Sequence, residues 1–538
     1  MNRRIFLSSG IAAVSAAGTM RTAVAAATNS TASSPVAETA YGKIRGSLHE
    51  KVYAFRGVPY GASTAGTNRF MLPKKPQPWT GFKETVELGH PSPQVFPGIE
   101  PPEVAATVPN TPVSEDCLVV NVWTQGLDSG KRPVMVWLHG GGFTSGSAGY
   151  TIYDGANLAR KRDVVVVGVN HRLNAFGYLY LAEIGGAKYA QSSNVGQMDI
   201  VAALEWVRDN IAHFGGDPNN VTIFGQSGGG AKVATLLAMP SAKDLFHKAI
   251  MESGTLLRGV PREQGNKVAE AFLGKLGLKP NQVDQLQSMP MDQLIAATKG
   301  PFNFSPVVDG KTLPRDPFDP GAPDVSGDVP ILLGSTETEM TFFAGGPLFP
   351  YPIDSLDDAS LKQNLKKFLR ADDSDTEKTI AVYKKVFPGI TPTDVFLKAT
   401  ADIGVRQMIA TVADRKAAQH KAPVYLYYFS WRSPVRDGKM KSYHTLEIPF
   451  VFENADVAKS MTGNGQDRYA LEDKMSGAFA AFARTGNPNF KGLPNWTAYN
   501  SDQRPTMIFN DTCKLVGDPS HQERMVLATV KRAPGGPF

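Results

Sequence analysis

The chain has 538 residues, a formal net charge of +6 at pH 7 and an apolar fraction of 42%. This length allows two to four ordinary domains or one elaborated α/β unit, and the apolar fraction is enough for a large core. No block of basic residues is interleaved with aromatic ones, which argues against a nucleic-acid partner.

The N-terminus has the features of an export signal. A twin arginine, Arg3-Arg4, precedes a modest apolar stretch over residues 10–20, and Ala23-Val24-Ala25 offers a small-residue cleavage site. We therefore expect residues 1–25 to be a signal peptide of the twin-arginine type, which sends a bacterial protein to the periplasm or the medium. No segment reaches about 18 consecutive apolar residues, so no stable membrane anchor is expected. Loss of the three arginines in this segment lowers the formal charge from +6 to +3.

The next segments lead into the main domain. Residues 26–37 are rich in Ser, Thr and Ala, which predicts a flexible lead-in. Residues 38–538 are expected to form a single domain. Short strands alternate with turns over residues 39–60, and the proline-rich stretch 91–113 predicts a long loop.

A glycine-rich motif follows the first long buried strand. Val134 to Leu138 is a continuous apolar run, and His139-Gly140-Gly141-Gly142-Phe143 comes directly after it. Bare backbone N–H groups in this position form an oxyanion hole in hydrolases, and the donors implied are Gly141 and Gly142. A phosphate-binding loop is the competing interpretation, but neither of the usual glycine patterns of such loops is present.

The pentapeptide around Ser227 has the context of a nucleophile. Val221 to Phe224 predicts a buried strand, Gly225-Gln226-Ser227-Gly228-Gly229 follows it, and Lys232 to Met239 predicts a helix. A serine at such a strand–turn–helix is exposed above the sheet, where Gly228 N–H would be the third oxyanion donor. A plain tight turn is the alternative. Two glycine-rich elements, each after a strand and in this order, favour the hydrolase.

Further apolar runs extend the sheet. We expect strands over 164–169, 249–251, 329–334 and 424–431, and helices over 200–211, 260–300, 340–420 and 471–484. Continuous apolar strands are typical of a sheet that is covered on both faces. The alternation predicts one large α/β domain with a mostly parallel central sheet flanked by helices. The segment 340–420 is the candidate insertion over the site.

The catalytic base should follow the later strands. In such a fold the acid and then the histidine come after the serine. Three histidines follow the strand near 330–334. His420 lies at a polar helix end and His521 in a charged tail, whereas His444 lies in a loop after the strand 424–431. This position favours His444, although an ordinary loop histidine is the alternative.

Three acids could hold the histidine, and spacing does not choose among them. They are Asp309, Glu337 and Glu339, of which the last two follow the strand that ends near residue 334. No H-E-x-x-H or C-x-x-C motif occurs, and the nine histidines are scattered, so we expect neither a metal nor a cofactor.

The chain resembles the type B carboxylesterase/lipase family, the cholinesterase-like branch of the α/β-hydrolases, from about residue 39 to 510. The resemblance rests on seven motifs in one order: Ser114-Glu115-Asp116-Cys117-Leu118, His139 to Gly146, Asn194 to Asp199, Phe214 to Pro218, Val221 to Gly230, Phe304 to Gly310 and Arg484 to Pro488. It implies the α/β-hydrolase fold and hydrolysis of a small-molecule carboxylic ester without a cofactor.

The resemblance also implies roles for single residues. Ser227 would be the nucleophile; Thr338 to Phe343 matches the family's acid motif and selects Glu339; His444 to Ile448 matches its histidine motif. Ser253 corresponds to a serine that supports the triad, and Arg69 with Glu115 to an ion pair that supports the walls of the site.

Four departures from the family pattern concern local shape. Gln226 and Gly228 replace the glutamate and alanine that flank the serine in cholinesterases. Thr445 and Met340 replace glycines after the histidine and the acid.

Two further departures concern the loops. The stretch 95–113 has no tryptophan for a quaternary ammonium, so choline esters are not expected. The upstream cysteine of the family disulfide is missing, so Cys117 should be a free, buried thiol.

The sequence thus predicts a serine carboxylesterase that works through an acyl-enzyme. Three alternatives stay open: an amidase or carbamate hydrolase, an esterase for a bulky polyanionic ester such as a fumonisin-type toxin, and a non-catalytic cholinesterase-like binding protein. The acyl group, the alcohol and the oligomeric state are not specified.

Overall fold

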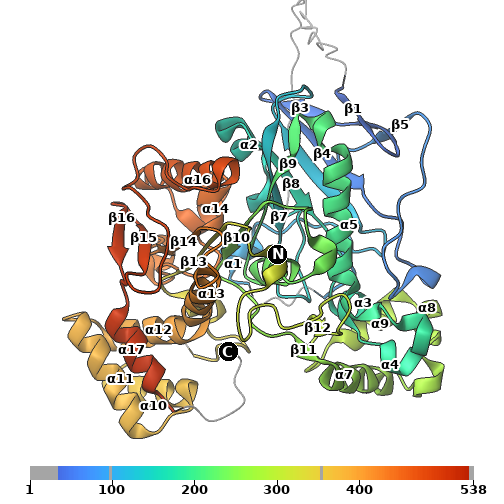
Figure 1. Cartoon of the computed structure of the whole chain (residues 1–538). Helices are drawn as coiled ribbons and strands as arrows, with labels where there is room; N and C mark the ends of the chain where they lie inside the picture. Colours follow the sequence, from blue (N-terminus) through green and yellow to red (C-terminus); the bar gives the residue numbers. More distant parts are fainter. Residues whose placement is uncertain (1–33, 96–99, 352–354, 532–538) are drawn as a thin grey trace, which may run out of the picture. The chain divides into compact units, whose positions relative to one another are not determined.

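The computed structural model of the protein describes residues 34–95, 100–351 and 355–531 (Figure 1). The expected signal peptide, residues 1–25, and most of the expected lead-in lie outside the described residues. The chain from Pro35 onward groups into one compact unit. Its first strand, β1, begins at Val36, two residues before the expected start of the domain.

An 11-stranded mixed sheet runs through the described part of the chain. In spatial order its strands are β3 (Ser47–His49), β4 (Val52–Pro59), β6 (Val119–Thr124), β8 (Val165–Val169), β7 (Arg132–Leu138), β9 (Gly216–Gln226), β10 (Lys248–Glu252), β13 (Ile331–Thr336), β14 (Val424–Phe429), β15 (Pro505–Phe509) and β16 (Lys514–Gly517). Two small sheets lie beside it: β1 (Val36–Thr39), β2 (Gly42–Arg45) and β5 (Phe82–Glu84) form one, and β11 (Val260–Pro261) and β12 (Val307–Val308) form the other.

The middle of the large sheet is parallel and its two margins are antiparallel. All neighbours from β8 to β15 pair in parallel, whereas β3, β4, β6 and β16 pair antiparallel. The carboxyl ends of β7, β9, β10, β13 and β14 therefore meet at one edge, where ligands bind in open α/β sheets.

Helices cover both faces of this sheet. In chain order they are α1 (Pro102–Ala105), α2 (Ala156–Arg162), α3 (Asn174–Tyr178), α4 (Ala182–Gly185), α5 (Val195–Asn210), α6 (Gly228–Leu237), α7 (Arg262–Lys275), α8 (Gln285–Ser288), α9 (Met291–Thr298), α10 (Asp358–Leu369), α11 (Asp373–Val386), α12 (Pro392–Ala401), α13 (Gln407–Ala417), α14 (Ile448–Val451), α15 (Lys459–Thr462), α16 (Asp467–Thr485) and α17 (His521–Thr529).

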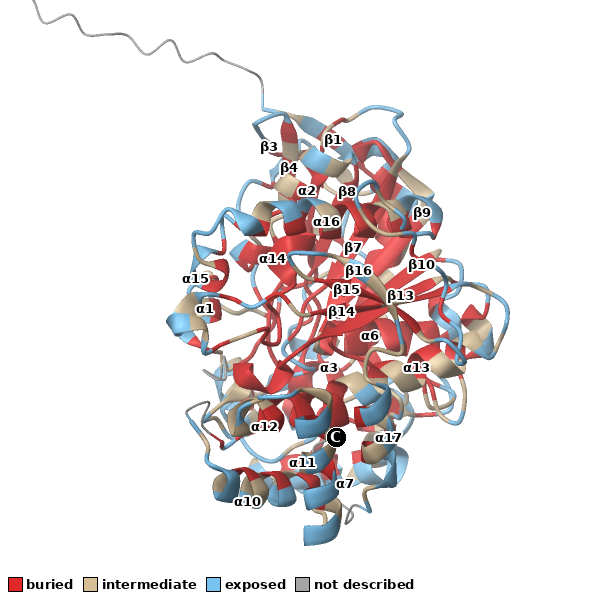
Figure 2. Cartoon of the chain, turned by 90° about the vertical axis from the view of Figure 1, so that its left-hand side faces the viewer, coloured by how far each residue is buried: buried red, intermediate tan, exposed pale blue. Residues whose placement is uncertain are grey.

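Alternate residues of a strand pack into two separate hydrophobic cores. In β7, Val134 and Val136 face a cluster with α5, α6 and α13, whereas Met135 and Trp137 face a cluster with α2, α14 and α16. This is why the strands are apolar without alternation. Figure 2 shows the buried strands between helices whose outer faces are exposed.

Most of the described residues of the expected insertion over 340–420 are helical. Helices α10, α11 and α12 share an apolar cluster with the C-terminal helix α17, which lies beside α11 (Figure 1). The cluster includes Met340, one residue after Glu339. The insertion thus packs directly against the segment that carries the expected acid.

The C-terminal elements β15, β16 and α17 were not predicted. Strand β15 is a five-residue run that begins with Pro505, and proline is unusual inside a sheet. It pairs with β14, whose partner residues lie about 80 positions earlier, so its status depends on a distant strand. His521, expected in a charged tail, begins α17.

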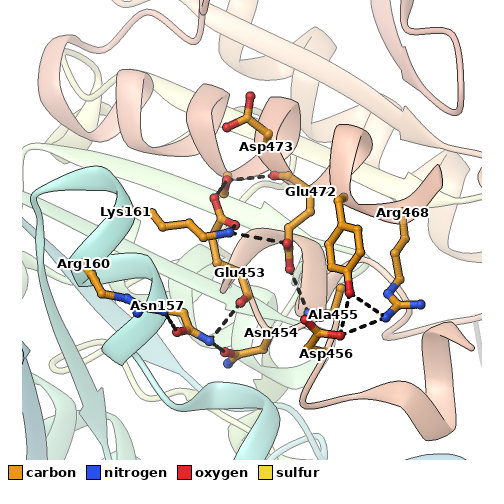
Figure 3. A network of polar contacts seen from close by, with 12 residues as sticks. Asn157, Arg160, Lys161, Glu453, Asn454, Ala455, Asp456, Arg468, Glu472 and Asp473 are labelled. Carbon is orange, nitrogen blue, oxygen red and sulfur yellow. Dashed lines mark hydrogen bonds and ion pairs between the residues drawn. The ribbon is translucent and has the colours of Figure 1, made fainter. Parts of the chain in front are cut away.

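A polar network joins the segment after His444 to two helices on one face of the sheet (Figure 3). Glu453, which follows α14, accepts hydrogen bonds from Lys161 and Arg162 of α2, both at 2.6 Å. It also accepts one from Ser476 of α16 at 2.6 Å. Charged donors around a buried carboxylate make strong bonds, so this network fixes the loop that leaves the histidine segment.

Two further observations concern the described residues as a set. None of their helices is long and apolar enough to cross a membrane. No group of three or more His, Cys, Asp and Glu side chains among them could hold a metal ion.

The buried pair of Arg172 and Asp199 supplies a test of stability. Three hydrogen bonds of 2.6–3.0 Å link the two residues, and their side chains are 1% and 0% exposed. We expect Asp199→Asn to lower the free energy of unfolding by about 3–5 kcal/mol, because it leaves a buried guanidinium without its counter-charge. Urea unfolding followed by tryptophan fluorescence measures this loss.

The control is the exposed pair of Arg45 and Glu84. Glu84→Gln should change the same free energy by less than about 1 kcal/mol. Equal effects of the two substitutions would contradict the importance assigned to the buried pair.

Candidate active site

Ser227 occupies a strained turn between β9 and α6. Its φ of 58° and ψ of −124° are uncommon for a residue with a side chain, and such strain is typical of functional sites. The turn is held by a hydrogen bond from Ser227 N–H to the Glu252 carbonyl at 2.8 Å. The side chain is half-buried at the N-terminus of α6, where the helix dipole favours negative charge.

Glycines make this turn possible because other chain segments touch it. A Cβ on Gly229 would lie 2.0 Å from the Leu138 carbonyl oxygen, and one on Gly230 would lie 2.3 Å from the Gly254 carbonyl oxygen. Neither position has room for a side chain. The sheet, the turn and the helix can therefore pack together only with glycine at both positions.

The glycine loop after β7 lies against the same turn. Gly141 and Gly142 have φ values of 86° and 60°, in the region that favours glycine. A Cβ on Gly228 would lie 2.5 Å from Gly142 N, and one on Gly140 would lie 3.5 Å from the Cβ of Ser227. The backbones of two separate segments are thus brought together beside the serine, and the contact leaves no room for a Cβ on Gly228.

Glu339 and His444 form a buried hydrogen-bonded pair. His444 Nδ1 lies 2.6 Å from Glu339 Oε2, and Glu339 Oε1 accepts from Thr336 N–H at 2.8 Å. Both side chains are buried. His444 Nε2 has no hydrogen-bond partner among the described residues, Ser227 Oγ included. This ring nitrogen is therefore free to accept a proton.

Two aromatic rings border the imidazole of His444. The ring centroids of Phe342 and Phe343 lie 5.6 and 5.3 Å from it. Phe342 is buried and Phe343 is half-buried. The base thus lies in apolar surroundings that limit contact with water.

Ser253 links the serine turn to the histidine segment. Ser253 follows β10, and its hydroxyl donates to Oε1 of Glu447 at 3.0 Å. Glu447 lies three residues after His444. The next residue, Gly254, packs so closely on Ser227 that a Cβ on Gly254 would lie 2.0 Å from the Ser227 carbonyl oxygen. Ser227, Ser253, Glu339 and His444 therefore occupy one edge, each after the end of a neighbouring strand.

Glu252 and Glu447 are buried acids that the sequence analysis did not single out. Burial, and then the charge of Glu339, raises the pKa of Glu447 to about 8. Burial and Glu447 raise the pKa of Glu252 well above its usual range, and neither of its oxygens has a partner among the described residues. Burial thus favours the protonated form of both acids. The sequence feature that could have identified Glu252 is its position directly after an apolar run. For Glu447 it is the position inside the histidine motif.

Glu337 points away from the histidine. Its Oε1 accepts from Lys398 at 2.8 Å and its Oε2 from Arg432 at 2.9 Å. Burial opposes its ionisation, but these two cations hold the pKa of Glu337 below its usual value. The structure therefore brings Glu339, and not Glu337, to His444.

The remaining candidates lie in other surroundings. Asp309 Oδ2 accepts from Ser193 Oγ at 2.8 Å, and its Oδ1 accepts from two backbone N–H groups of its own turn. His420 and His521 are exposed. His521 Nδ1 lies 2.8 Å from Asp518 Oδ2 at the start of α17. None of the three approaches the histidine–glutamate pair.

Arg69 and Glu115 form a buried ion pair. The two hydrogen bonds between them measure 2.5 and 2.6 Å. Arg69 also donates to the carbonyl of Leu286 at 3.0 Å and to that of Met289. The pair thus ties the segment before β6 to α8.

Two departures from the family pattern have structural consequences. Thr445 has a φ of 80°, which is strained for a β-branched residue and shows why glycine is common after the histidine. Cys117 is fully buried and free, as expected, and burial raises the pKa of its thiol to about 12.

Lys232 is a further buried charge near the site. It lies in α6 and donates to the His139 carbonyl at 2.8 Å. From the sequence, Lys232 was predicted only to begin a helix. The signal was a single lysine within an otherwise small and apolar helical stretch.

Comparison with known proteins places these features in a family. The model of the carboxylesterase family matches residues 33–527. The para-nitrobenzyl esterase of Bacillus subtilis is 36% identical over 509 residues, which cover 91% of this chain and 98% of that protein. The phenmedipham hydrolase of Pseudarthrobacter oxydans is 33% identical and covers 89% and 95% of the two chains.

A solved structure agrees with this assignment. The carboxylesterase of Geobacillus stearothermophilus matches with a TM-score of 0.77 and 36% identity over 91% of this chain and 99% of that one. The expected α/β-hydrolase fold is thereby confirmed. The chain belongs to the carboxylesterase family and is a carboxylic ester hydrolase of the serine esterase type.

Proposed function

We propose that Ser227, His444 and Glu339 are the catalytic triad of this esterase and that the reaction proceeds through an acyl-enzyme. The observation that carries the proposal is the 2.6 Å contact of His444 Nδ1 with Glu339, with Nε2 unpartnered at the same sheet edge as the strained Ser227. His444 Nε2 takes the proton of Ser227 Oγ while this oxygen attacks the ester carbonyl.

The resulting tetrahedral oxyanion is bound by backbone N–H groups. We assign these donors to Gly141, Gly142 and Gly228, because the backbones of Gly142 and Gly228 touch beside the serine. His444 then gives its proton to the leaving alkoxide, and the alcohol departs. Water, deprotonated by the same imidazole, attacks the acyl-enzyme, and the carboxylic acid leaves as Ser227 regains its proton.

The neighbouring acids support the role of Glu339. Burial favours the protonated forms of Glu252 and Glu447, which opposes a second negative charge close to Glu339. Glu339 holds the imidazole ring and stabilises its positive charge after proton transfer.

We also propose that the preferred substrates are esters with an apolar or aromatic group. Phe342 and Phe343 border His444 and present apolar surface to whatever binds there. One relative is a para-nitrobenzyl esterase by name. Burial of such a group removes its apolar surface from water and so contributes to binding.

We further propose that residues 1–25 direct export. The support is Arg3-Arg4, the apolar stretch that follows and the small residues before Ala26.

The test of the triad is hydrolysis of p-nitrophenyl esters from acetate to laurate. We expect turnover by the mature protein and its loss in Ser227→Ala, by at least about 10⁴-fold, because the nucleophile is removed. A fluorophosphonate probe should label the wild type and not the variant. A folded wild type that neither turns over any ester nor takes the label would instead indicate a binding protein.

The assignment of the acid is tested by a matched pair of substitutions. Glu339→Gln should lower kcat by about 10³–10⁴-fold, because the amide no longer stabilises the imidazolium. Glu337→Gln should keep kcat within about tenfold and lower thermal stability instead, since it leaves Lys398 and Arg432 without their counter-charge. Equal losses of kcat would contradict the assignment.

Export is tested by N-terminal sequencing of protein expressed in a bacterium with a twin-arginine pathway. We expect periplasmic protein that begins at Ala26 or Thr28, and retention in the cytoplasm when both Arg3 and Arg4 are replaced by lysine. Export of the doubly substituted chain at the wild-type level would contradict the twin-arginine assignment.

A further inference from the structure

A fully buried lysine lies behind the glycine loop that follows β7. Lys232 is five residues after Ser227 on α6, and its side chain is 0% exposed. Its Nζ donates to the His139 carbonyl at 2.8 Å and lies 5.8 Å from the centre of the Phe143 ring. Among the described residues no carboxylate forms an ion pair with it. A buried cation without a counter-charge is costly, so its retention calls for an explanation.

The bond from Lys232 fixes the first peptide of the glycine loop. The His139 carbonyl and the Gly140 N–H belong to one planar trans peptide and point in opposite directions. His139 acts on the next peptide in the same way, because its Nδ1 lies 2.8 Å from the Gly140 carbonyl, which shares a plane with Gly141 N–H. The two bonds therefore set the directions of consecutive N–H groups.

The glycine loop needs such anchors because its residues are unusually free. Gly141 and Gly142 are in positive-φ conformations and have no side chain to restrict them. The helix approaches the loop closely, since a Cβ on Gly229, one turn before Lys232, would lie 3.1 Å from the His139 carbonyl oxygen. The missing side chain of Gly229 leaves room for the His139 carbonyl, and Lys232 donates the hydrogen bond to this carbonyl.

The titratable groups that face Lys232 are two histidines. The rings of His139 and His171, which follow β7 and β8, stack at 4.9 Å. Burial, and then the charge of Lys232, lowers the pKa of both well below the usual range, so they are neutral at neutral pH. Strands β9 and β10 and helix α5 also pack on α6, and among the described residues none of them brings a charge that shifts the pKa of Lys232.

We propose that Lys232 is a positioning residue for ester hydrolysis: its ammonium group holds the His139–Gly142 loop in the shape that binds the oxyanion and places positive charge behind that loop. This role rests on the proposed function of Ser227. Because the oxyanion carries its negative charge only in the transition state and the intermediate, Lys232 acts on kcat and leaves KM nearly unchanged.

The role makes the rate depend on the protonation of Lys232. Burial lowers the pKa of Lys232 to about 7, so the group is charged below this pH and neutral above it. The rate should therefore fall as pH rises through about 7. Glu447 titrates nearby, at about 8, and must be separated from Lys232.

The experiment is the pH dependence of kcat and KM for p-nitrophenyl butyrate, normalised by fluorophosphonate titration of Ser227. The variants are Lys232→Met, which removes the charge, and Lys232→Arg, which keeps it at every pH. Lys416→Met is the matched control. That lysine is also buried and donates to the carbonyls of Ser326 and Gly327, and burial lowers its pKa to about 8.

In Lys232→Met we expect kcat at pH 6.5 to fall by about tenfold, less than the roughly 10²–10³-fold that loss of a direct oxyanion donor costs. KM should stay within about twofold of the wild type. The decline above about pH 7 should disappear in both Lys232 variants, and it should persist in Lys416→Met and in Glu447→Gln.

A Lys232→Met variant with the wild-type kcat and an unchanged decline of kcat above about pH 7 would overturn this role. So would a decline that persists in Lys232→Met and disappears in Glu447→Gln. If Lys232→Met does not fold, the test depends on Lys232→Arg. A decline of kcat above about pH 7 that persists in Lys232→Arg contradicts the proposal, and loss of this decline supports it. Hydrolysis that survives Ser227→Ala would overturn the proposed function itself, and the role of Lys232 with it.

Discussion

The site depends on an approach of two main chains that leaves no room for side chains. A Cβ on Gly228 would lie 2.3–2.5 Å from three backbone atoms of Gly142. The register of the sheet brings these segments together, because Leu138 at the end of β7 is paired with Gly225 near the end of β9. The glycine loop and the serine turn therefore begin side by side, as the proposed oxyanion hole requires. Strain at Ser227 is tolerated because the contacts of Gly229, Gly230 and Gly254 leave the turn no other path.

Burial then separates the charges of the site. Desolvation favours the protonated forms of Glu252 and Glu447, whereas Glu339 is the acid that contacts His444. Lys232 follows the serine on α6, and its ammonium group donates to the His139 carbonyl at the start of the glycine loop. Under the proposed mechanism, the fold thus supplies a negative group where the imidazolium would form and a positive one where the oxyanion would form. Such an arrangement lowers the barrier because the groups are fixed before the reaction begins.

Much of this site follows from local sequence, and what does not depends on distant packing. The turn at Ser227 and the loop at Gly141 could be predicted because glycines directly after apolar strands allow the positive-φ, closely packed turns that these segments adopt. Spacing alone could not separate Glu337 from Glu339. Glu337 contacts Lys398 and Arg432, whereas Glu339 contacts His444, and each of these partners is more than 60 positions away in the sequence.

Lys232 was missed for the same reason, since its partner His139 lies 93 positions earlier. The strands β15 and β16 were missed because short strands at the margin of a sheet acquire their identity from a neighbour.

The most direct measurement is a crystal structure of the protein after reaction with a p-nitrophenyl alkylphosphonate, whose tetrahedral phosphorus imitates the intermediate. The triad assignment predicts a covalent bond to Ser227 Oγ and His444 Nε2 within hydrogen-bond distance of the adduct. It also predicts a phosphonyl oxygen about 2.7–3.1 Å from the backbone nitrogens of Gly141, Gly142 and Gly228. A phosphonate attached to another residue, or one whose oxygen points away from these nitrogens, would contradict it.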